Sequence, residues 1–219
     1  MICISKVTGI INEYLKPLNM TKTYYSFDVN NIHFTVIDPH IDHSFDSTQY
    51  QFIEQDLQNA SPINNPNIDW VFVEHIPIYT STSKHPANST IRDIYHPLFD
   101  KYNVDLVFNG DNHNYQRTFP LKYNREDDSS LPIISDRNLN NYNSSSGDYS
   151  GQIYIITGTG GRSLYEIKQQ APFVAIQHDK HYGFLNLDFS INNTLTVILL
   201  EEEAILSVFL HICITFEPF

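Results

Sequence analysis

The run from Val104 to Leu121 constrains the fold more than any other stretch of this chain. It opens with a short apolar strand, predicted at Val104–Phe108, which breaks at Gly110. In open α/β sheets, functional sites lie just beyond the carboxyl ends of the strands. The run therefore predicts a metal or catalytic site at a strand end, with Asp111 and His113 as its first candidate residues.

A second run, Trp70 to Tyr79, has the same form, since an apolar strand ends there at His75. A helix is predicted between the two runs, over Ser89–Tyr102, from apolar residues at helical spacing. A strand–helix–strand unit crosses over right-handed and makes its two strands parallel neighbours. His75 and the pair Asp111 and His113 should then follow carboxyl ends at one edge of the sheet, where they can converge.

Together these runs resemble the calcineurin-like metallophosphoesterases and, within them, the purple acid phosphatases. The family reads Gly-His-x-His-x-Tyr-x-Arg where this chain has Gly110 to Arg117. The family's upstream metal-binding histidine, followed closely by Pro and Tyr, is similar to His75 with Pro77 and Tyr79. Further matches in the same order lie at Tyr24–Phe27, Asn31–Phe34, Lys101–Val107, Thr157–Gly161 and Tyr182–Phe184, so that the resemblance covers roughly residues 12 to 190.

Two departures from the family pattern matter. Asp111 stands where the family has the first histidine of its pair. The family's earlier motifs, Asp-x-Gly, Gly-Asp-x-x-Tyr and Gly-Asn-His, have no match in this chain. The resemblance thus implies a mixed α/β fold: the C-terminal half of a metallophosphoesterase β-sandwich flanked by helices, lacking the first strands. It implies one N-terminally incomplete domain over residues 1–219. The stretch 122–150 is long, charged and rich in Asn and Ser, and this composition predicts a mobile surface insertion.

The resemblance also implies a site. His75 would bind one metal ion and His113 the other, with Asp111 at a third ligand position. The ions would be iron with zinc or manganese, and two such metals supply both a nucleophilic water and compensation for phosphoryl charge. His85 lies where the family often has a histidine facing the substrate, and it is a candidate proton donor to the leaving group. Arg117 either adds positive charge or pairs with a nearby carboxylate.

Two functions follow from these expectations. The first is an acid phosphatase that hydrolyses phosphoric monoesters at a dinuclear metal centre, with a phosphate ester as substrate. The second is a catalytically inactive fragment or binding module, because the family draws its bridging aspartate, asparagine and iron-binding tyrosine from the absent motifs. The isolated chain is expected to be inactive, and the missing N-terminal half of the domain is the implied partner.

Composition excludes some classes of partner. The formal net charge of −12 over 219 residues argues against nucleic acid, whose phosphates require clustered Lys and Arg. The N-terminal residues do not match a secretory signal, and the stretch Ala204–Phe216 is too short for a bilayer span of about 20 residues. No membrane partner is expected; family members are often secreted, but the sequence assigns no compartment. Cys3 and Cys213 are predicted to be unrelated thiols.

Several further elements are predicted. A short helix should end near Pro17, and a longer one should span Asp46–Ala60, with Asp46 as its cap and Gln49 completing a capping box. Hairpins are expected at 24–37, turned by Asn30-Asn31, and at 183–200, turned by Asn192-Asn193.

Two loops carry open alternatives. The residues His40, Asp42 and His43 form either a metal cluster or a solvated loop. A buried strand, Ile153–Thr157, ends in the glycine-rich run 158–161, which either binds a phosphate group or lets the backbone pass close to the site loops. A nucleotide loop is disfavoured because no Lys-Ser/Thr follows.

Overall fold

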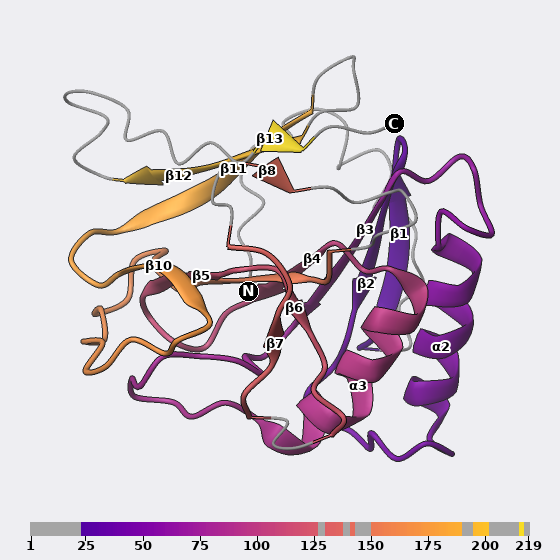
Figure 1. Ribbon diagram of the computed structural model, residues 1–219, viewed down its shortest axis with the longest axis horizontal. Helices are drawn as coiled ribbons and strands as arrows, with labels where there is room; N and C mark the ends of the chain where they lie inside the picture. The colour runs from indigo at the N-terminus through magenta and orange to yellow at the C-terminus, as the bar shows by residue number, and fades with distance from the viewer. Residues whose placement is uncertain are drawn as a thin grey trace.

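The computed structural model of the chain describes residues 23–126, 130–137, 141–142, 150–189, 195–201 and 215–216. Within them lie a seven-stranded sheet, a four-stranded sheet, a two-stranded sheet and two helices, α2 and α3 (Figure 1). The helices cover one face of the large sheet and the four-stranded sheet covers the other. This arrangement confirms the predicted mixed α/β sandwich flanked by helices.

The strand order of the large sheet is β1-β2-β3-β4-β9-β5-β10. Its strands are β1 (Tyr25–Val29), β2 (Ile32–Val36), β3 (Trp70–His75), β4 (Leu106–Asn109), β9 (Ile153–Thr157), β5 (Tyr115–Thr118) and β10 (Val174–His178). The four-stranded sheet holds β11 (Gly183–Phe189), β12 (Leu195–Glu201), β13 (Thr215–Phe216) and β8 (Asn141–Tyr142), while β6 (Leu121–Lys122) pairs with β7 (Ile133–Ile134).

The predicted strand–helix–strand unit is confirmed, since β3 and β4 are parallel neighbours with α3 (Ser89–Tyr102) between them in the chain. The helix ends at Asn103, which adopts the left-handed conformation typical of a helix terminus. Strand β4 begins at Leu106 rather than at the predicted Val104. The Val104 amide still donates to the last turn of the helix, at the Phe99 carbonyl.

Helix α2 (Thr48–Ala60) starts later than predicted, and the predicted capping box is wrong. Its cap is Ser47, whose hydroxyl accepts the Tyr50 amide proton. Gln49 does not reach back to the cap, because its side chain is buried and bonds both the amide and the carbonyl of Asp38.

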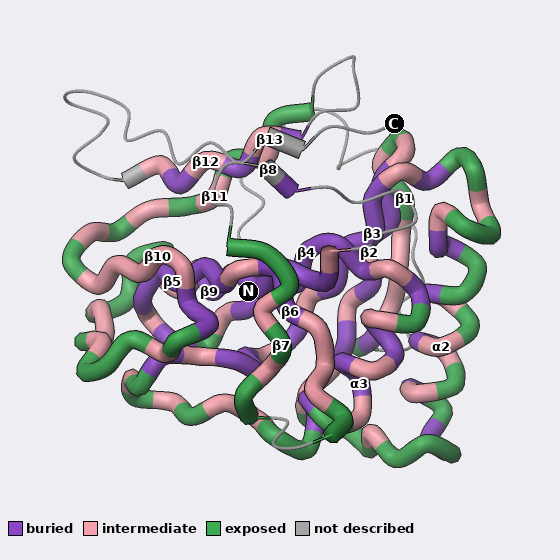
Figure 2. Tube along the Cα trace, viewed as in Figure 1, coloured by how far each residue is buried: buried purple, intermediate pink, exposed green. Residues whose placement is uncertain are grey.

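Two apolar cores lie on the two faces of the large sheet, and β3 contributes to both. Val71 and Val73 pack toward the helices, whereas Trp70 and Phe72 pack toward the four-stranded sheet. The nearly unbroken apolar sequence of this strand is therefore explained by burial on both faces. Figure 2 shows the buried residues running through the central strands.

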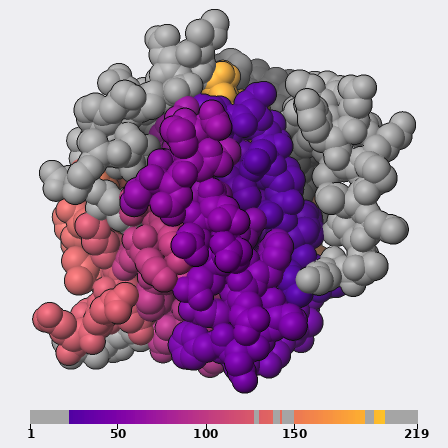
Figure 3. All heavy atoms as spheres, turned by 90° about the vertical axis from the view of Figure 1, so that its right-hand side faces the viewer, coloured from indigo at the N-terminus to yellow at the C-terminus, as the bar shows by residue number. Residues whose placement is uncertain are grey.

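A polar contact joins the edge hairpin to α2, and Figure 3 views the molecule from this side. His33 lies between the Asp28 and Asp56 carboxylates, at 2.6 and 2.9 Å. Burial lowers the pKa of His33, but the hydrogen bonds and charges of the two carboxylates outweigh it and raise that pKa above its ordinary value. An imidazole held between two carboxylates, one on the hairpin and one on α2, thus fixes the helix against the sheet.

Both predicted hairpins are confirmed as β1–β2 and β11–β12. Asn30 turns the first with a φ of 56°, while the Asn192-Asn193 turn lies outside the described residues. The short helix near Pro17 and most of the tail also lie outside them, and the mobility of the insertion at 122–150 stays a prediction. In the described parts of the chain, no helix is long and apolar enough to cross a bilayer.

Candidate functional site at the ends of β3 and β4

The ends of β3 and β4 lie side by side. His75 is the register partner of Asn109, and the Asn109 side-chain amide donates to the His75 carbonyl at 2.8 Å. The residues that follow these strands therefore start from one edge of the sheet, which is the placement that the sequence predicted.

His75 is held within the core on the helix side. It is 5% exposed, and its ring lies 5.9 Å from the ring of Phe99. Burial lowers the pKa of His75 to about 4, so the imidazole is neutral at physiological pH. Its Nδ1 contacts the Ile76 carbonyl, which assigns the proton to Nδ1 and the lone pair to Nε2. The Nε2 atom is buried with no hydrogen-bond partner among the described residues, a form suited to metal ligation.

Asp111 follows Gly110 at a sharp corner of the backbone. Its φ is 64°, a conformation in which Asp, Asn and His are the most frequent residues other than glycine. The side chain is 49% exposed, and its Oδ2 lies 4.0 Å from Nδ1 of His85. The structure thus brings together the predicted third ligand and the predicted proton donor.

His113 is positioned by polar and aromatic contacts with the segment after the glycine-rich run. Its ring stacks on Tyr165 with 3.9 Å between centroids, and the Tyr165 amide donates to the His113 carbonyl. Nδ1 lies 2.9 Å from the Ser163 carbonyl, which assigns the proton to Nδ1 and leaves the Nε2 lone pair for a ligand.

His85 lies on the loop after β3, and its main chain is bonded to Asn112. The His85 amide donates to Asn112 Oδ1 at 3.0 Å, and Asn112 Nδ2 donates to the His85 carbonyl at 2.9 Å. The His85 ring also lies 5.6 Å from Tyr165, which contacts His113 as well. His85, Asp111 and His113 therefore belong to one cluster around Tyr165.

The glycine-rich run supports this cluster by close packing. A Cβ on Gly158 would stand 2.1 Å from the carbonyl oxygen of Asn112, so only glycine fits there. The predicted close approach of the backbone to the site loops is confirmed at this residue.

The three predicted metal ligands do not form one cluster among the described residues. The described contacts of His75 lie in the helix-side core, whereas those of His113 lie with Tyr165. No group of three or more His, Cys, Asp or Glu side chains in the described ranges is placed to hold a metal ion. Each imidazole has the donor chemistry of a ligand, and their convergence on a shared bimetallic centre stays a prediction.

Other candidate residues have structural surroundings. Arg117 is 3% exposed within β5, a position in the sheet interior rather than at the exposed rim. Tyr115 packs in the core between the sheets. In the loop before α2, His43 bonds Gln49 and Tyr95, and no metal cluster forms there among the described side chains.

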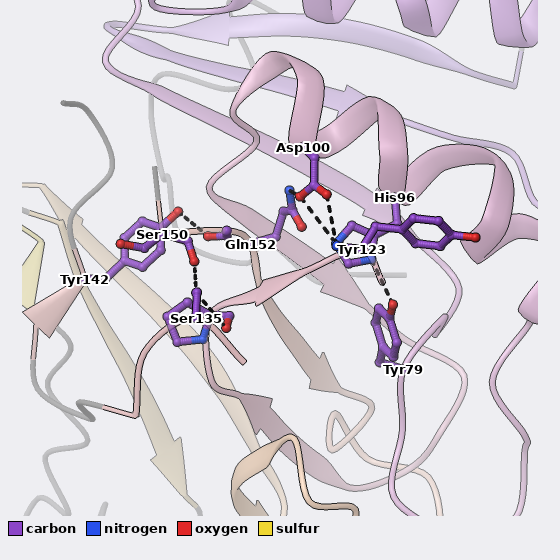
Figure 4. A network of polar contacts seen from close by, with 10 residues as sticks. Tyr79, His96, Asp100, Tyr123, Ser135, Tyr142, Ser150 and Gln152 are labelled. Carbon is purple, nitrogen blue, oxygen red and sulfur yellow. Dashed lines mark hydrogen bonds and ion pairs between the residues drawn. The ribbon is translucent and has the colours of Figure 1, made fainter. Parts of the chain in front are cut away.

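A buried polar network on the helix side of the sheet was not predicted from the sequence (Figure 4). His96 Nδ1 lies 2.9 Å from the Tyr79 hydroxyl and its Nε2 lies 3.6 Å from Asp100, which also accepts from Gln152. Burial lowers the pKa of His96 to about 3. The network ties α3 to Gln152, the residue before β9, and to Tyr79 on the loop after β3. A histidine inside an amphipathic helix gives no sequence signal for such a role.

Comparison with known proteins agrees with this geometry, although no family model matches the chain. The chain is 30% identical over 178 residues to "Probable inactive purple acid phosphatase 27" of Arabidopsis thaliana, covering 77% of this chain and 26% of that protein. It is 28% identical over 180 residues to the "Nucleotide pyrophosphatase/phosphodiesterase" of Hordeum vulgare, covering 80% and 45%. The fold matches the purple acid phosphatase PPD1 of yellow lupin seeds with a TM-score of 0.68 and 22% identity, over 89% of this chain and 32% of that one.

Taken together, the sequence similarities and the fold make this chain similar to the metallophosphoesterases. Within that superfamily the chain is purple acid phosphatase-like. It spans about a quarter of the length of the Arabidopsis relatives that it matches, at 26% to 28% of each.

Proposed function

We propose that the chain supplies one wall of a metal-dependent site for the hydrolysis of phosphoric monoesters. The observation that carries the proposal is the 4.0 Å approach of His85 to Asp111 at the edge where β3 and β4 end. His75, Asp111 and His113 would be the metal ligands, for iron with zinc or manganese. When bound, the metals would lower the pKa of a water molecule and compensate the charge on the phosphoryl oxygens.

His85 is the proposed proton donor to the leaving group. Its side chain is 38% exposed, so a substrate can reach the ring. A carboxylate at 4.0 Å orients an imidazole, and the bonds from Asn112 hold the main chain beneath it. Both contacts favour transfer of a proton at a fixed position.

Local positive charge would help an anionic ester to approach a chain with a net charge of −12. Lys84 precedes His85, and its ammonium lies 4.3 Å from the centre of the Tyr165 ring. It therefore stands beside the cluster that also contains His113.

We further propose that residues 1–219 are one incomplete domain, whose metal centre needs the upstream family motifs from a separate segment. The partner would be the part of the domain that carries Asp-x-Gly, Gly-Asp-x-x-Tyr and Gly-Asn-His. The isolated chain would then not hydrolyse phosphate esters.

A second candidate function is a non-catalytic binding module. It is favoured by Asp111, which adds negative charge where the family has a neutral ligand, and by three relatives whose names include the word "inactive". Under this function the fold keeps the cluster around Tyr165 but performs no hydrolysis.

The test has two stages. The purified chain is assayed with p-nitrophenyl phosphate in the presence of Fe³⁺ with Zn²⁺ or Mn²⁺, and its metal content is measured in parallel. We expect negligible hydrolysis, and robust turnover that is abolished in His113→Ala would contradict the inactivity of the isolated chain.

In the second stage the chain is co-expressed with a segment that carries the three upstream motifs. We expect metal-dependent hydrolysis that is lost in His113→Ala and unaffected in Asn64→Ala, whose side chain is exposed and donates to the Gln58 carbonyl, away from the site. A stable, metal-loaded complex without hydrolysis would favour the binding module.

A further inference from the structure

The segment that follows β4 alternates between two kinds of side chain. Asp111 and His113 are partly or fully exposed, whereas Asn112, Asn114 and Gln116 are buried. We call these three buried side chains the amide ladder. Because they lie between the candidate ligands in sequence, any neighbour that they fix is also fixed relative to the candidate site.

Asn112 bonds the main chain of His85 twice, once as acceptor and once as donor. Its Nδ2 also lies 3.2 Å from the Thr80 hydroxyl. The Asn112 side chain therefore pairs with the amide and the carbonyl of His85, two main-chain groups that a neighbouring strand would pair with in a sheet.

Gln116 and Asn114 repeat this function along the same loop. Gln116 Oε1 accepts from the Ser81 amide at 2.6 Å, and its Nε2 donates to the Thr80 hydroxyl at 3.0 Å. Asn114 Nδ2 donates to the Ser83 hydroxyl at 2.9 Å and to the Tyr165 carbonyl at 3.2 Å. The amide ladder thus contacts both walls of the cluster, namely the His85 loop and the Tyr165 segment.

The ladder is also internally connected and closely packed. Gln116 Nε2 donates to Asn114 Oδ1 at 2.9 Å, which fixes the orientation of both amides. Gly158 donates its amide to the Asn114 carbonyl and packs against the Asn112 carbonyl. Removing one buried amide would leave its partners without hydrogen bonds, at a cost larger than that of the bond alone.

We propose that the amide ladder positions the functional residues of the site, with Asn112 as the positioning residue for His85 opposite Asp111. Asn114 holds the Tyr165 segment, against which His113 stacks. The role of His85 in hydrolysis rests on the proposed function, whereas the positioning itself is a property of the folded chain and is tested without activity.

The first experiment measures amide hydrogen exchange by NMR in the purified chain. Asn112→Ala should raise the exchange rate of the His85 amide by about tenfold and leave the Ser81 amide nearly unchanged, because one buried hydrogen bond is lost locally. Gln116→Ala should do the reverse, raising exchange at Ser81. Asn64→Ala, at an exposed side chain, should change neither.

This crossed design separates positioning from general destabilisation. If Asn112 only stabilised the fold as a whole, Asn112→Ala would raise the exchange rates of both the His85 and the Ser81 amides. It would also lower the midpoint of thermal unfolding by a corresponding amount. If Asn112→Ala does not fold, Gln116→Ala carries the same test at Ser81. Unchanged exchange at the partnered amide in either folded variant would overturn the proposal.

The second experiment measures the position of the His85 ring. Nuclear Overhauser contacts between the His85 ring and the Asp111 side chain should be present in the wild type and in Asn64→Ala, and lost in Asn112→Ala. Persistence of these contacts in a folded Asn112→Ala chain would refute the role of Asn112.

An active complex would give a third readout. Asn112→Ala should lower kcat for phenyl phosphate, a poor leaving group, more than for p-nitrophenyl phosphate, with little change in KM. Equal losses for both esters would contradict positioning of a proton donor. Absence of hydrolysis in the wild-type complex would instead contradict the proposed function, and the exchange results would still decide the positioning.

Discussion

His75 ends β3 and His113 follows the neighbouring strand β4, yet two different kinds of interaction hold them. His75 is set by the apolar core, with the Phe99 ring beside it and almost no solvent access. His113 is set by a stacked ring and polar bonds close to the surface. The core fixes an imidazole by excluding water, which also lowers its pKa, whereas the polar cluster fixes one by directed bonds and leaves it accessible.

The largest effect should come from Phe99→Ala, which removes the ring beside His75. Deleting a fully buried phenyl group costs about 3–5 kcal/mol of unfolding free energy. Water that enters the space should also raise the pKa of His75 from about 4 toward its ordinary value, because burial is the main cause of the shift. Urea unfolding and an NMR titration of His75 measure both changes.

The matched change on the other side is Tyr165→Ala, which removes the ring stacked on His113. Its cost should be about 1 kcal/mol, because the ring is only partly buried. Urea unfolding of both variants measures the difference. Equal losses of unfolding free energy in Phe99→Ala and Tyr165→Ala would contradict the view that the core holds His75 and that surface contacts hold His113.

Acid should destabilise the His75 side of the comparison. The unfolded chain takes up a proton at His75 below its ordinary pKa near 6.5, whereas the folded chain resists protonation until about pH 4. The stability contributed by neutral His75 is complete above pH 6.5 and falls as the pH drops toward 4, by about 3 kcal/mol.

Unfolding free energies of the wild type and His75→Gln at pH 7 and pH 4.5 test this expectation. His75→Gln should lose less stability on acidification than the wild type does. His96→Gln is the parallel variant, because burial lowers the pKa of His96 in the same direction. An identical pH dependence in wild type and His75→Gln would show that His75 is not buried and neutral in the folded chain.

On the polar side, Gly158→Ala should be the most costly change. The added methyl would overlap the Asn112 carbonyl, and overpacking of this kind costs about 1–3 kcal/mol, here near the upper end. Gly160→Ala is the control, because a Cβ there meets no atom within 4 Å. Thermal unfolding of both variants measures the difference, and equal stability would mean that the loops do not pack as closely as described.

The smallest expected effect on folding belongs to Asp111→His, which restores the family's residue. Its backbone has a left-handed conformation that histidine also adopts, so stability should change by less than about 0.5 kcal/mol. Zinc affinity should rise by about tenfold, because an imidazole suits this ion better than a single exposed carboxylate. Isothermal titration with Zn²⁺ measures the gain, with Asp111→Asn as control. Unchanged affinity would argue against a ligand position at this corner.

The layers of the fold could be predicted because they depend on periodicity that a sequence displays. The apolar run of β3, the helical spacing over Ser89–Tyr102 and the Asn30-Asn31 turn each gave the correct element. The prediction of the α2 cap failed because Asp46 and Ser47 are both suitable capping residues. Only the path of the backbone decides which of the two side chains reaches a free amide of the first helical turn.

The candidate site was predictable in part. A strand that ends before Asp111 and His113 marks a functional edge, and the close approach at Gly158 was also expected from sequence. The contact between His85 and Asp111 could not be predicted, because it depends on the bonds from Asn112 to the His85 main chain. Asparagine is common in this chain, so a single one carries no signal in the sequence. The regular spacing of Asn112, Asn114 and Gln116 was the available sign of one buried face.

The alternation between Asp111 and Asn114 has a consequence for how this chain tolerates change. One inserted or deleted residue after Gly110 would reverse the inward and outward sets, turning carboxamides to water and an imidazole and a carboxylate toward the loop that now receives amide bonds. Substitutions at the outward positions do not change which side chains face inward. The segment should therefore tolerate different side chains at its outward positions but not a change in its number of residues.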